Sequence, residues 1–169
     1  MTPKGKPWST SGVKPILFLD VDGVLNAFPR GYEKRRVQLD YGHVLHFTKY
    51  TKPFMRWAWS EFEVCWCTAW GERANLIADW ASLPRKKCIV DIRVPGEDWK
   101  LKGVRQYLKG KRGPAVWIED GIGEEAEAWA RKRGIIYVET GPRLGVTKGH
   151  ALLLADTLGL SLEGWRGNR

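Results

Sequence analysis

Residues 15–26 read PILFLDVDGVLN, and this stretch decides the fold that we expect. It opens with an apolar run, 16–19, that has no polar position on either face. A strand with two apolar faces is typical of a parallel sheet that helices cover on both sides. The run ends at Asp20, and Asp22 and Gly23 follow. We therefore expect two carboxylates at the point where a buried strand leaves the sheet.

Further apolar runs and amphipathic segments alternate along the rest of the chain. Four runs of strand length lie at 63–68, 88–92, 115–118 and 135–138. Helical patterns lie at 51–62, with Thr51 as the expected N-cap, at 72–82, 98–108 and 124–132, and between Thr147 and Gly159. This alternation predicts an α/β fold of three layers, a Rossmann-like arrangement around a five-stranded, mainly parallel sheet.

The pattern changes between residues 26 and 52. Two short alternating runs, 36–40 and 43–47, flank a Tyr-Gly pair and predict a β-hairpin inserted after the first strand. No stretch has room for a full cap domain. The length of 169 residues fits one domain at 15–169, after a flexible tail at 1–14 that is rich in Pro, Gly, Ser and Lys.

Composition limits the class of protein. The formal net charge is +9, from 28 basic and 19 acidic residues, with a pI near 9.6. This balance favours a polyanionic partner such as nucleic acid, although a solvated basic surface explains it equally well. Three cysteines provide no disulfide framework, so we expect Cys65 and Cys67 in the core of a cytoplasmic protein. We find neither a secretory signal nor a run near the ~20 apolar residues of a membrane span.

Polar residues end three of the predicted strands and open one helix, and a parallel sheet brings such positions to one edge. They are Asp20, Asp22, Thr68, Glu119 and Asp120, with Lys100 and Lys102 in the helix. Phosphoryl transfer uses such a set, because one carboxylate can attack phosphorus while a second protonates the leaving oxygen. Carboxylates repel an anionic substrate, so we expect Mg²⁺, which prefers oxygen ligands. A lysine and a threonine hydroxyl would bind the phosphoryl oxygens, and Gly23 would let backbone N–H groups approach them.

Three strings resemble motifs of the haloacid dehalogenase (HAD) superfamily. LFLDVDGVLN at 17–26 resembles motif I, Cys67-Thr-Ala-Trp70 resembles motif II, and Trp117-Ile-Glu-Asp120 resembles the paired-acid motif IV. The chain is similar in particular to the small HAD domain associated with RNA-repair proteins, also found as stand-alone bacterial and phage proteins. The strings WxTxW, WK and WIDD of that group have counterparts at 66–70, 99–100 and 117–120. The resemblance covers residues 15 to 160.

The resemblance implies a Mg²⁺-dependent phosphatase, a phosphomonoester hydrolase that works through an aspartyl-phosphate, in a bacterial or phage-infected cell. Asp20 would be the nucleophile and a metal ligand, and Asp22 would be the general acid/base with its backbone carbonyl on the metal. Asp120 would complete the metal site. The phosphoryl group would contact Thr68, Lys100 and Gly23. Further candidates are Glu119, which replaces the first Asp of the pair, Lys102 as the alternative lysine, Ala69 and Arg30.

An uncapped site favours a large substrate such as a nucleic-acid end. The basic segment 30–36 lies in the hairpin region, where phosphate contacts and solvated charge explain it equally well. We interpret 85–87, 109–112 and 131–133 as solubilising charge. The first hypothesis is a polynucleotide or nucleotide phosphatase. One alternative is a nucleic-acid-binding protein that keeps a HAD fold without turnover. Another is a phosphatase of small sugar or nucleotide phosphates. We expect no membrane association and infer no protein partner.

Overall fold

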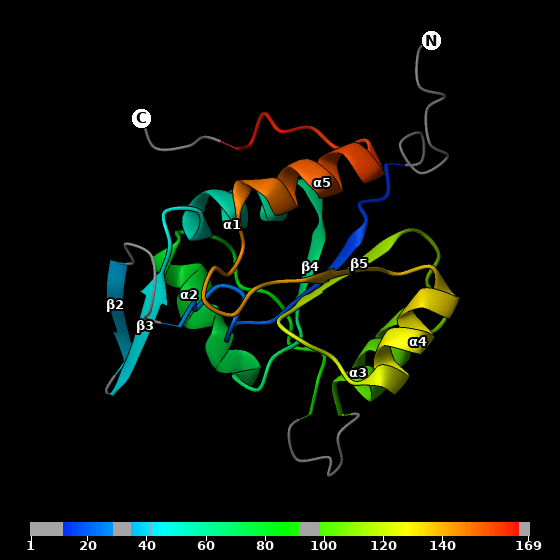
Figure 1. Cartoon of the computed structure of the whole chain (residues 1–169), viewed down its shortest axis with the longest axis horizontal. Coiled ribbons are helices and arrows are strands. Elements are labelled where there is room, and N and C mark those ends of the chain that lie inside the picture. Colours follow the sequence, from blue (N-terminus) through cyan, green and yellow to red (C-terminus); the bar gives the residue numbers. More distant parts are fainter. Residues whose placement is uncertain (1–11, 29–34, 41, 92–98, 166–169) are drawn as a thin grey trace.

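The computed structural model describes residues 12–28, 35–40, 42–91 and 99–165 (Figure 1). Its elements, in chain order, are β1 (Ile16–Leu19), β2 (Arg35–Asp40), β3 (His43–Phe47), α1 (Thr51–Glu61), β4 (Glu63–Trp66), η1 (Gly71–Ala74), α2 (Asn75–Trp80), α3 (Trp99–Leu108), β5 (Ala115–Glu119), α4 (Glu124–Arg133), β6 (Ile136–Glu139) and α5 (Lys148–Leu158). Most of the predicted tail at 1–14 lies outside the described residues. No described helix is long and apolar enough to cross a bilayer.

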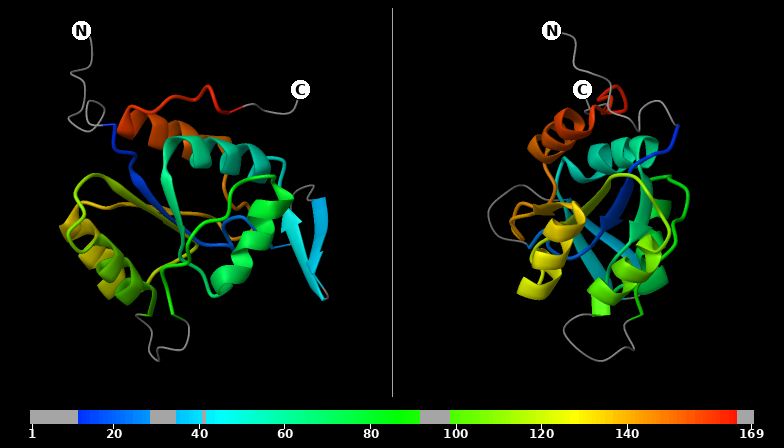
Figure 2. Two further views of the ribbon diagram at one scale, coloured as in Figure 1. Left: turned by 180° about the vertical axis from the view of Figure 1, so that it is seen from behind. Right: turned by 90° about the vertical axis from the view of Figure 1, so that its right-hand side faces the viewer.

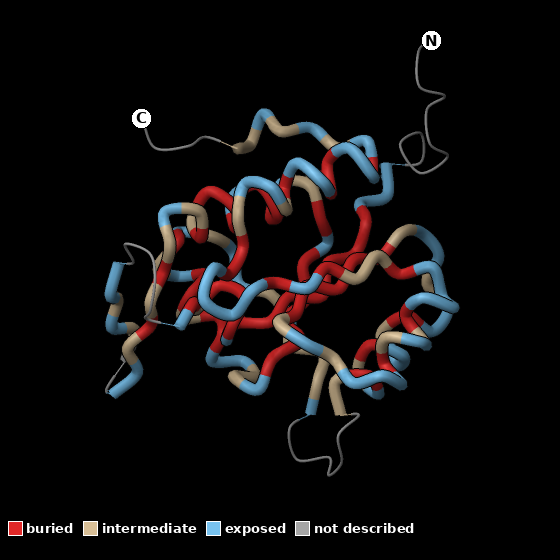
Figure 3. Tube along the Cα trace, in the orientation of Figure 1, coloured by how far each residue is buried: buried red, intermediate tan, exposed pale blue. Residues whose placement is uncertain are grey.

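The main sheet has four strands in the order β4-β1-β5-β6, and every pair in it is parallel. The predicted α/β class is therefore confirmed, with helices on both faces of a parallel sheet. Alternate residues of β1 separate the two faces. Leu17 and Leu19 pack with α1, α2 and α5, whereas Ile16 and Phe18 pack with α3 and α4. Figures 1 and 2 show the resulting three layers, and Figure 3 shows buried positions concentrated between them.

The fifth strand predicted at 88–92 is represented, in its described part 88–91, by one isolated parallel bridge. Trp66 pairs with Cys88, and the Ile89 N–H donates to the Trp66 carbonyl over 3.0 Å. The pairing does not extend toward Lys86, because the backbone N–H and C=O of Lys86 both bond to the Asn75 side chain. A side chain thus occupies the groups that a ladder beside β4 would need.

The predicted hairpin is confirmed as the antiparallel pair β2–β3, which forms its own two-stranded sheet. Leu45 and Phe47 of β3 are buried in the larger core cluster. The Phe47 ring lies 4.4 Å from the Trp80 ring of α2. The Ala27 N–H donates to the His46 carbonyl, so the segment after β1 is attached to the hairpin. The hairpin is therefore packed against the domain beside the carboxyl end of β1.

Helix ends follow capping chemistry with two differences from expectation. Thr147 caps α5 through a capping box with His150, as expected. Tyr50, and not Thr51, is the N-cap of α1, and Thr51 is the first helical residue. The Thr51 hydroxyl does not cap the helix, because it donates to the Leu25 carbonyl and accepts the Thr48 N–H. The helix expected at 72–82 is divided into η1 and α2, where the Asn75 side chain bonds outside the helix.

Asn75 connects α2 to the strand that leads into the site. It is only 5% exposed, and its Oδ1 accepts the Trp66 indole N–H at 2.9 Å and the Lys86 N–H at 2.8 Å. Its Nδ2 donates to Lys86 O at 3.0 Å and Glu72 Oε2 at 3.1 Å. Since Trp66 ends β4, this amide holds the segment from which Thr68 emerges.

Asn75→Ala is expected to lower the free energy of unfolding by about 2–3 kcal/mol, because it leaves the buried Trp66 N–H without its acceptor. Urea unfolding followed by tryptophan fluorescence measures the change. Gln106→Ala, at an exposed position of α3, is the control and should leave stability within about 0.5 kcal/mol of wild type. Equal stability of the two variants would contradict the structural role of Asn75.

Candidate active site

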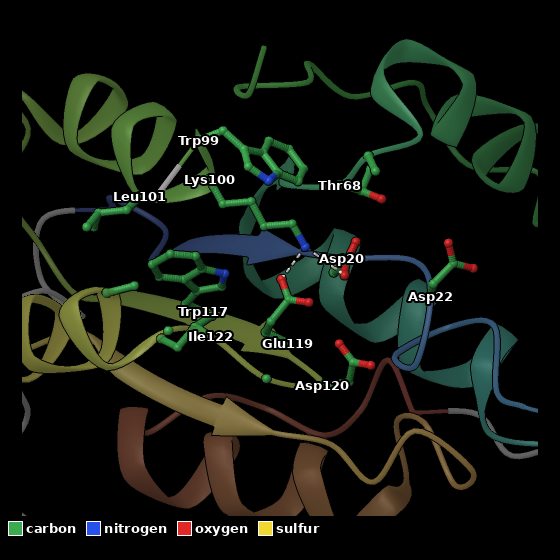
Figure 4. A pocket seen from close by; sticks show the side chains of 14 residues that line it. Asp20, Asp22, Thr68, Trp99, Lys100, Leu101, Trp117, Glu119, Asp120 and Ile122 are labelled. Carbon is green, nitrogen blue, oxygen red and sulfur yellow. Dashed lines mark hydrogen bonds and ion pairs between the residues drawn. The ribbon is translucent and has the colours of Figure 1, made fainter. Parts of the chain in front are cut away.

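A pocket of about 350 Å³ opens at the carboxyl ends of the central strands (Figure 4). Its polar lining consists of Asp20, Asp22, Thr68, Lys100, Glu119 and Asp120. The structure thus brings to one place six of the eight residues to which the sequence assigned chemistry, and the other two, Lys102 and Gly23, do not line this pocket. Ala69 also lines the pocket, while Arg30 lies outside the described residues.

Three neighbouring strands supply the acids and the hydroxyl. Asp20 directly follows β1, Glu119 ends β5, and Asp120 is the next residue. Thr68 lies two residues after β4. Because β4, β1 and β5 are adjacent and parallel, their carboxyl ends meet at one edge of the sheet. Asp20, Thr68 and Glu119 are all at least 95% buried, so the site is set into the domain and not laid on its surface.

Lys100 enters the pocket from the first turn of α3. Its Nζ lies 2.9 Å from Asp20 Oδ2 and 2.6 Å from Glu119 Oε2, and its side chain is 19% exposed. Lys102, two residues further along the helix, is exposed and lines a different groove. Residues two apart on a helix do not share a face. Of the two lysines left open by the sequence, Lys100 is therefore the one in the pocket.

Burial and shared hydrogen bonds shift the pKa values of Asp20 and Glu119 in opposite directions. Burial, together with the hydrogen bond and charge of Asp20, raises the pKa of Glu119. Burial alone would raise the pKa of Asp20 as well, but the hydrogen bond with Glu119, the charge of Lys100 and a hydrogen bond with Thr68 together lower it. The same two contacts therefore shift the pKa values of the two carboxyls in opposite directions, down for Asp20 and up for Glu119.

The acidic side chains also fit a divalent cation. Asp20, Glu119 and Asp120 each offer an oxygen, and these three oxygens lie within 4.8 Å of one another. A set made only of carboxylate oxygens suits a hard cation such as Mg²⁺. Lys100 offsets only one of the three charges when all are ionised, so the cluster has an excess of negative charge. Glu119, which replaces an Asp of the resembling motif, belongs to this cluster.

Asp22 stands apart from the three clustered carboxylates, on the exposed rim of the pocket (Figure 4). Its Oδ1 accepts from Asn26 Nδ2 at 2.8 Å, and its Oδ2 accepts from the Trp70 indole N–H at 2.9 Å. Asn26 is itself fixed, because its Oδ1 accepts the His46 backbone N–H at 2.8 Å. Sequence reasoning assigned no role to Asn26 or Trp70. The sequence feature that could have indicated their roles is proximity, since Asn26 closely follows Asp22 and Trp70 closely follows Thr68.

Position 23 requires glycine for two reasons, its backbone conformation and the lack of space for a side chain. Its φ is +76°, and a Cβ built there would overlap the Asp120 carboxylate. Its carbonyl accepts from the Thr140 hydroxyl at 2.8 Å, and its N–H donates to Asn26 O at 2.8 Å. The absent side chain therefore leaves room for Asp120, while the phosphate contact expected of Gly23 stays a prediction.

Gly23→Ala should displace Asp120 and lower the free energy of unfolding by at least about 1 kcal/mol, since alanine disfavours a positive φ. Gly121→Ala is the matched control in the same pocket, because a Cβ at Gly121 meets no atom within 4 Å. Chemical denaturation of both variants measures the difference. If Gly23→Ala is as stable as Gly121→Ala, the close packing of Gly23 against Asp120 is wrong.

No protein-family model, no curated protein and no solved structure matches this chain.

Proposed function

We propose that this chain is a Mg²⁺-dependent phosphomonoester hydrolase of the HAD type that acts on nucleic-acid ends or nucleotides. The observation that carries the proposal is the buried Asp20 carboxylate, which lies 2.9 Å from the Lys100 ammonium and shares its pocket with Thr68. Asp22 lies on the rim of the same pocket. The Rossmann-like arrangement supports a HAD fold, and its fifth strand would continue the sheet from the Trp66–Cys88 bridge.

In the first step, an Asp20 carboxylate oxygen attacks phosphorus and forms a new P–O bond. The P–O bond to the leaving group breaks, and Asp22 gives its proton to the leaving oxygen. Lys100 and the Thr68 hydroxyl stabilise the negative charge on the phosphoryl oxygens. The hydrogen bonds from Asn26 and Trp70 hold Asp22 toward the rim, where a leaving group has access to solvent.

In the second step, the ionised Asp22 accepts a proton from water, and the water oxygen attacks phosphorus. The bond between phosphorus and Asp20 breaks, which returns the Asp20 carboxylate and releases inorganic phosphate. Asp20, Glu119 and Asp120 would hold the metal. When bound, Mg²⁺ supplies positive charge that offsets the carboxylates and the phosphoryl group.

Asp20→Asn keeps the size and most hydrogen bonds of the side chain but removes the nucleophilic carboxylate. Phosphate release from an aryl phosphate and from 3′- and 5′-phosphorylated oligonucleotides should fall about a thousandfold or more. Asp156→Asn, an exposed position on α5, is the matched control and should retain wild-type turnover. Turnover that survives Asp20→Asn would exclude Asp20 as the nucleophile.

Metal binding is testable without turnover. Titration calorimetry with Mg²⁺ should show one site in the wild type, and Mg²⁺ should raise the melting temperature, because a ligand that binds only the folded state stabilises it. Asp120→Asn removes one of the three clustered carboxylates and should weaken Mg²⁺ binding about tenfold or more. Equal affinity in Asp120→Asn and Asp156→Asn would show that the cluster is not the metal site.

A small-molecule phosphatase is the alternative that the pocket volume of about 350 Å³ favours, since pockets of this size suit small ligands. It predicts that free nucleotide or sugar monophosphates are turned over faster than oligonucleotides, with little dependence on salt. A nucleic-acid-binding protein without turnover predicts oligonucleotide binding and no phosphate release from any substrate.

A further inference from the structure

A second groove, of about 750 Å³, lies between α3 and α4 and shares Leu101 with the candidate active-site pocket. We refer to it as the α3–α4 groove. Its charged and aromatic lining consists of Lys102, Arg105, Lys109, Arg133, Glu125 and Trp129. Figures 1 and 2 show the two helices side by side on one face of the sheet.

The groove is positively charged. Its single carboxylate in that lining, Glu125, pairs with Arg105 at 3.4 Å, and both side chains are largely exposed. Within the described part of the chain, Lys102, Lys109 and Arg133 form no ion pair. The sequence places Lys109 and Arg133 in separate basic segments, which we interpreted as solubilising charge. The structure brings both residues to the lining of one groove, and the interpretation as solubilising charge stays a prediction.

The groove leads away from the pocket. Both helices begin beside the site, since Lys100 of α3 and Gly123 before α4 line the pocket. Lys102 lies in α3 and Lys109 directly follows its last residue, so the helix separates the two by about 10 Å. A chain leaving the pocket along this path would therefore meet cations in succession. It would also meet Trp129, whose ring lies 5.3 Å from the Arg105 guanidinium.

We propose that the α3–α4 groove binds the sugar-phosphate backbone of a single-stranded polynucleotide whose terminal phosphate occupies the pocket. This inference rests on the proposed function. Spaced cations suit repeating phosphates, and a partly exposed tryptophan offers a stacking surface for a base. Because the groove adjoins the candidate active-site pocket at Leu101, a polymer that ends in a phosphate fits it better than an acidic protein does. The concave shape argues against a membrane surface.

The test is binding of a fluorescent single-stranded oligonucleotide with a terminal phosphate, measured by anisotropy over a series of KCl concentrations. All proteins have the Asp20→Asn background, so no substrate is consumed. The groove variant is Lys109→Glu/Arg133→Glu. The matched control is Arg131→Glu/Lys132→Glu, which makes the same charge change on the last turn of α4 at positions that do not line the groove.

Removal of two phosphate contacts should weaken binding roughly tenfold at 0.1 M salt and reduce the slope of log Kd against log salt by about 1.4, at about 0.7 per contact. Lys109→Gln/Arg133→Gln should give the same direction of change with less risk to folding. The control variant should stay within about twofold of the Asp20→Asn parent at 0.1 M salt, because it removes no phosphate contact. Equal losses in the groove and control variants would show only a general effect of charge and would overturn the proposal.

Two further arms separate the possible outcomes. In these arms, polyglutamate or phosphatidylserine vesicles replace the oligonucleotide. If the groove variant loses affinity for either of them and keeps its affinity for the oligonucleotide, the proposal is overturned in favour of that partner. Wild-type turnover of an aryl phosphate tests the proposed function separately. If that turnover is absent while the groove variant still loses oligonucleotide binding, the groove inference stands and the phosphatase proposal fails.

Discussion

The Lys100 ammonium between the carboxyls of Asp20 and Glu119 is the interaction on which the rest of the site depends. Parallel pairing of Leu19 with Ile118 places Asp20 and Glu119 side by side at the carboxyl ends of β1 and β5. Two buried carboxyls at this spacing would repel each other if both were ionised. The ammonium lies within 2.9 Å of both and gives the pair a counter-charge. Removing one partner of such a buried pair leaves an uncompensated charge, which is strongly destabilising.

This ion pair also explains the position of α3. The helix must approach the sheet closely enough for a residue in its first turn to reach both carboxyls. Gly103 lets α3 lie close to the segment that follows the Trp66–Cys88 bridge, because a Cβ there would lie 2.5 Å from the Ile89 carbonyl oxygen. Leu101 and Val104 then pack in the core beneath the helix. The same placement puts α3 beside α4, so the basic groove and the acidic pocket follow from one packing arrangement.

Periodicity and strand-end chemistry were sufficient to predict the α/β class, the hairpin and the convergence of the acids on one edge. Those features depend on local patterns and on the geometry of parallel strands. The strand predicted at 88–92 is reduced to one bridge in its described part, because its neighbour β4 ends at Trp66 and offers no residue beyond the Trp66–Cys88 bridge. The roles of Asn26 and Trp70 also depend on three-dimensional contacts. The choice between Lys100 and Lys102 was open because it depends on where α3 begins and which way it faces.

The central claim is that Asp20 forms a covalent bond to phosphorus. The most direct measurement is rapid acid quenching during turnover of a phosphorylated oligonucleotide, followed by mass spectrometry of the proteolysed protein. We predict a phosphoryl group on the peptide that contains residues 16–26, and fragmentation should place it on Asp20 and not on Asp22. The adduct should be absent from Asp20→Asn. Turnover without any phosphorylated peptide, or with the phosphoryl group on another residue, would contradict the account.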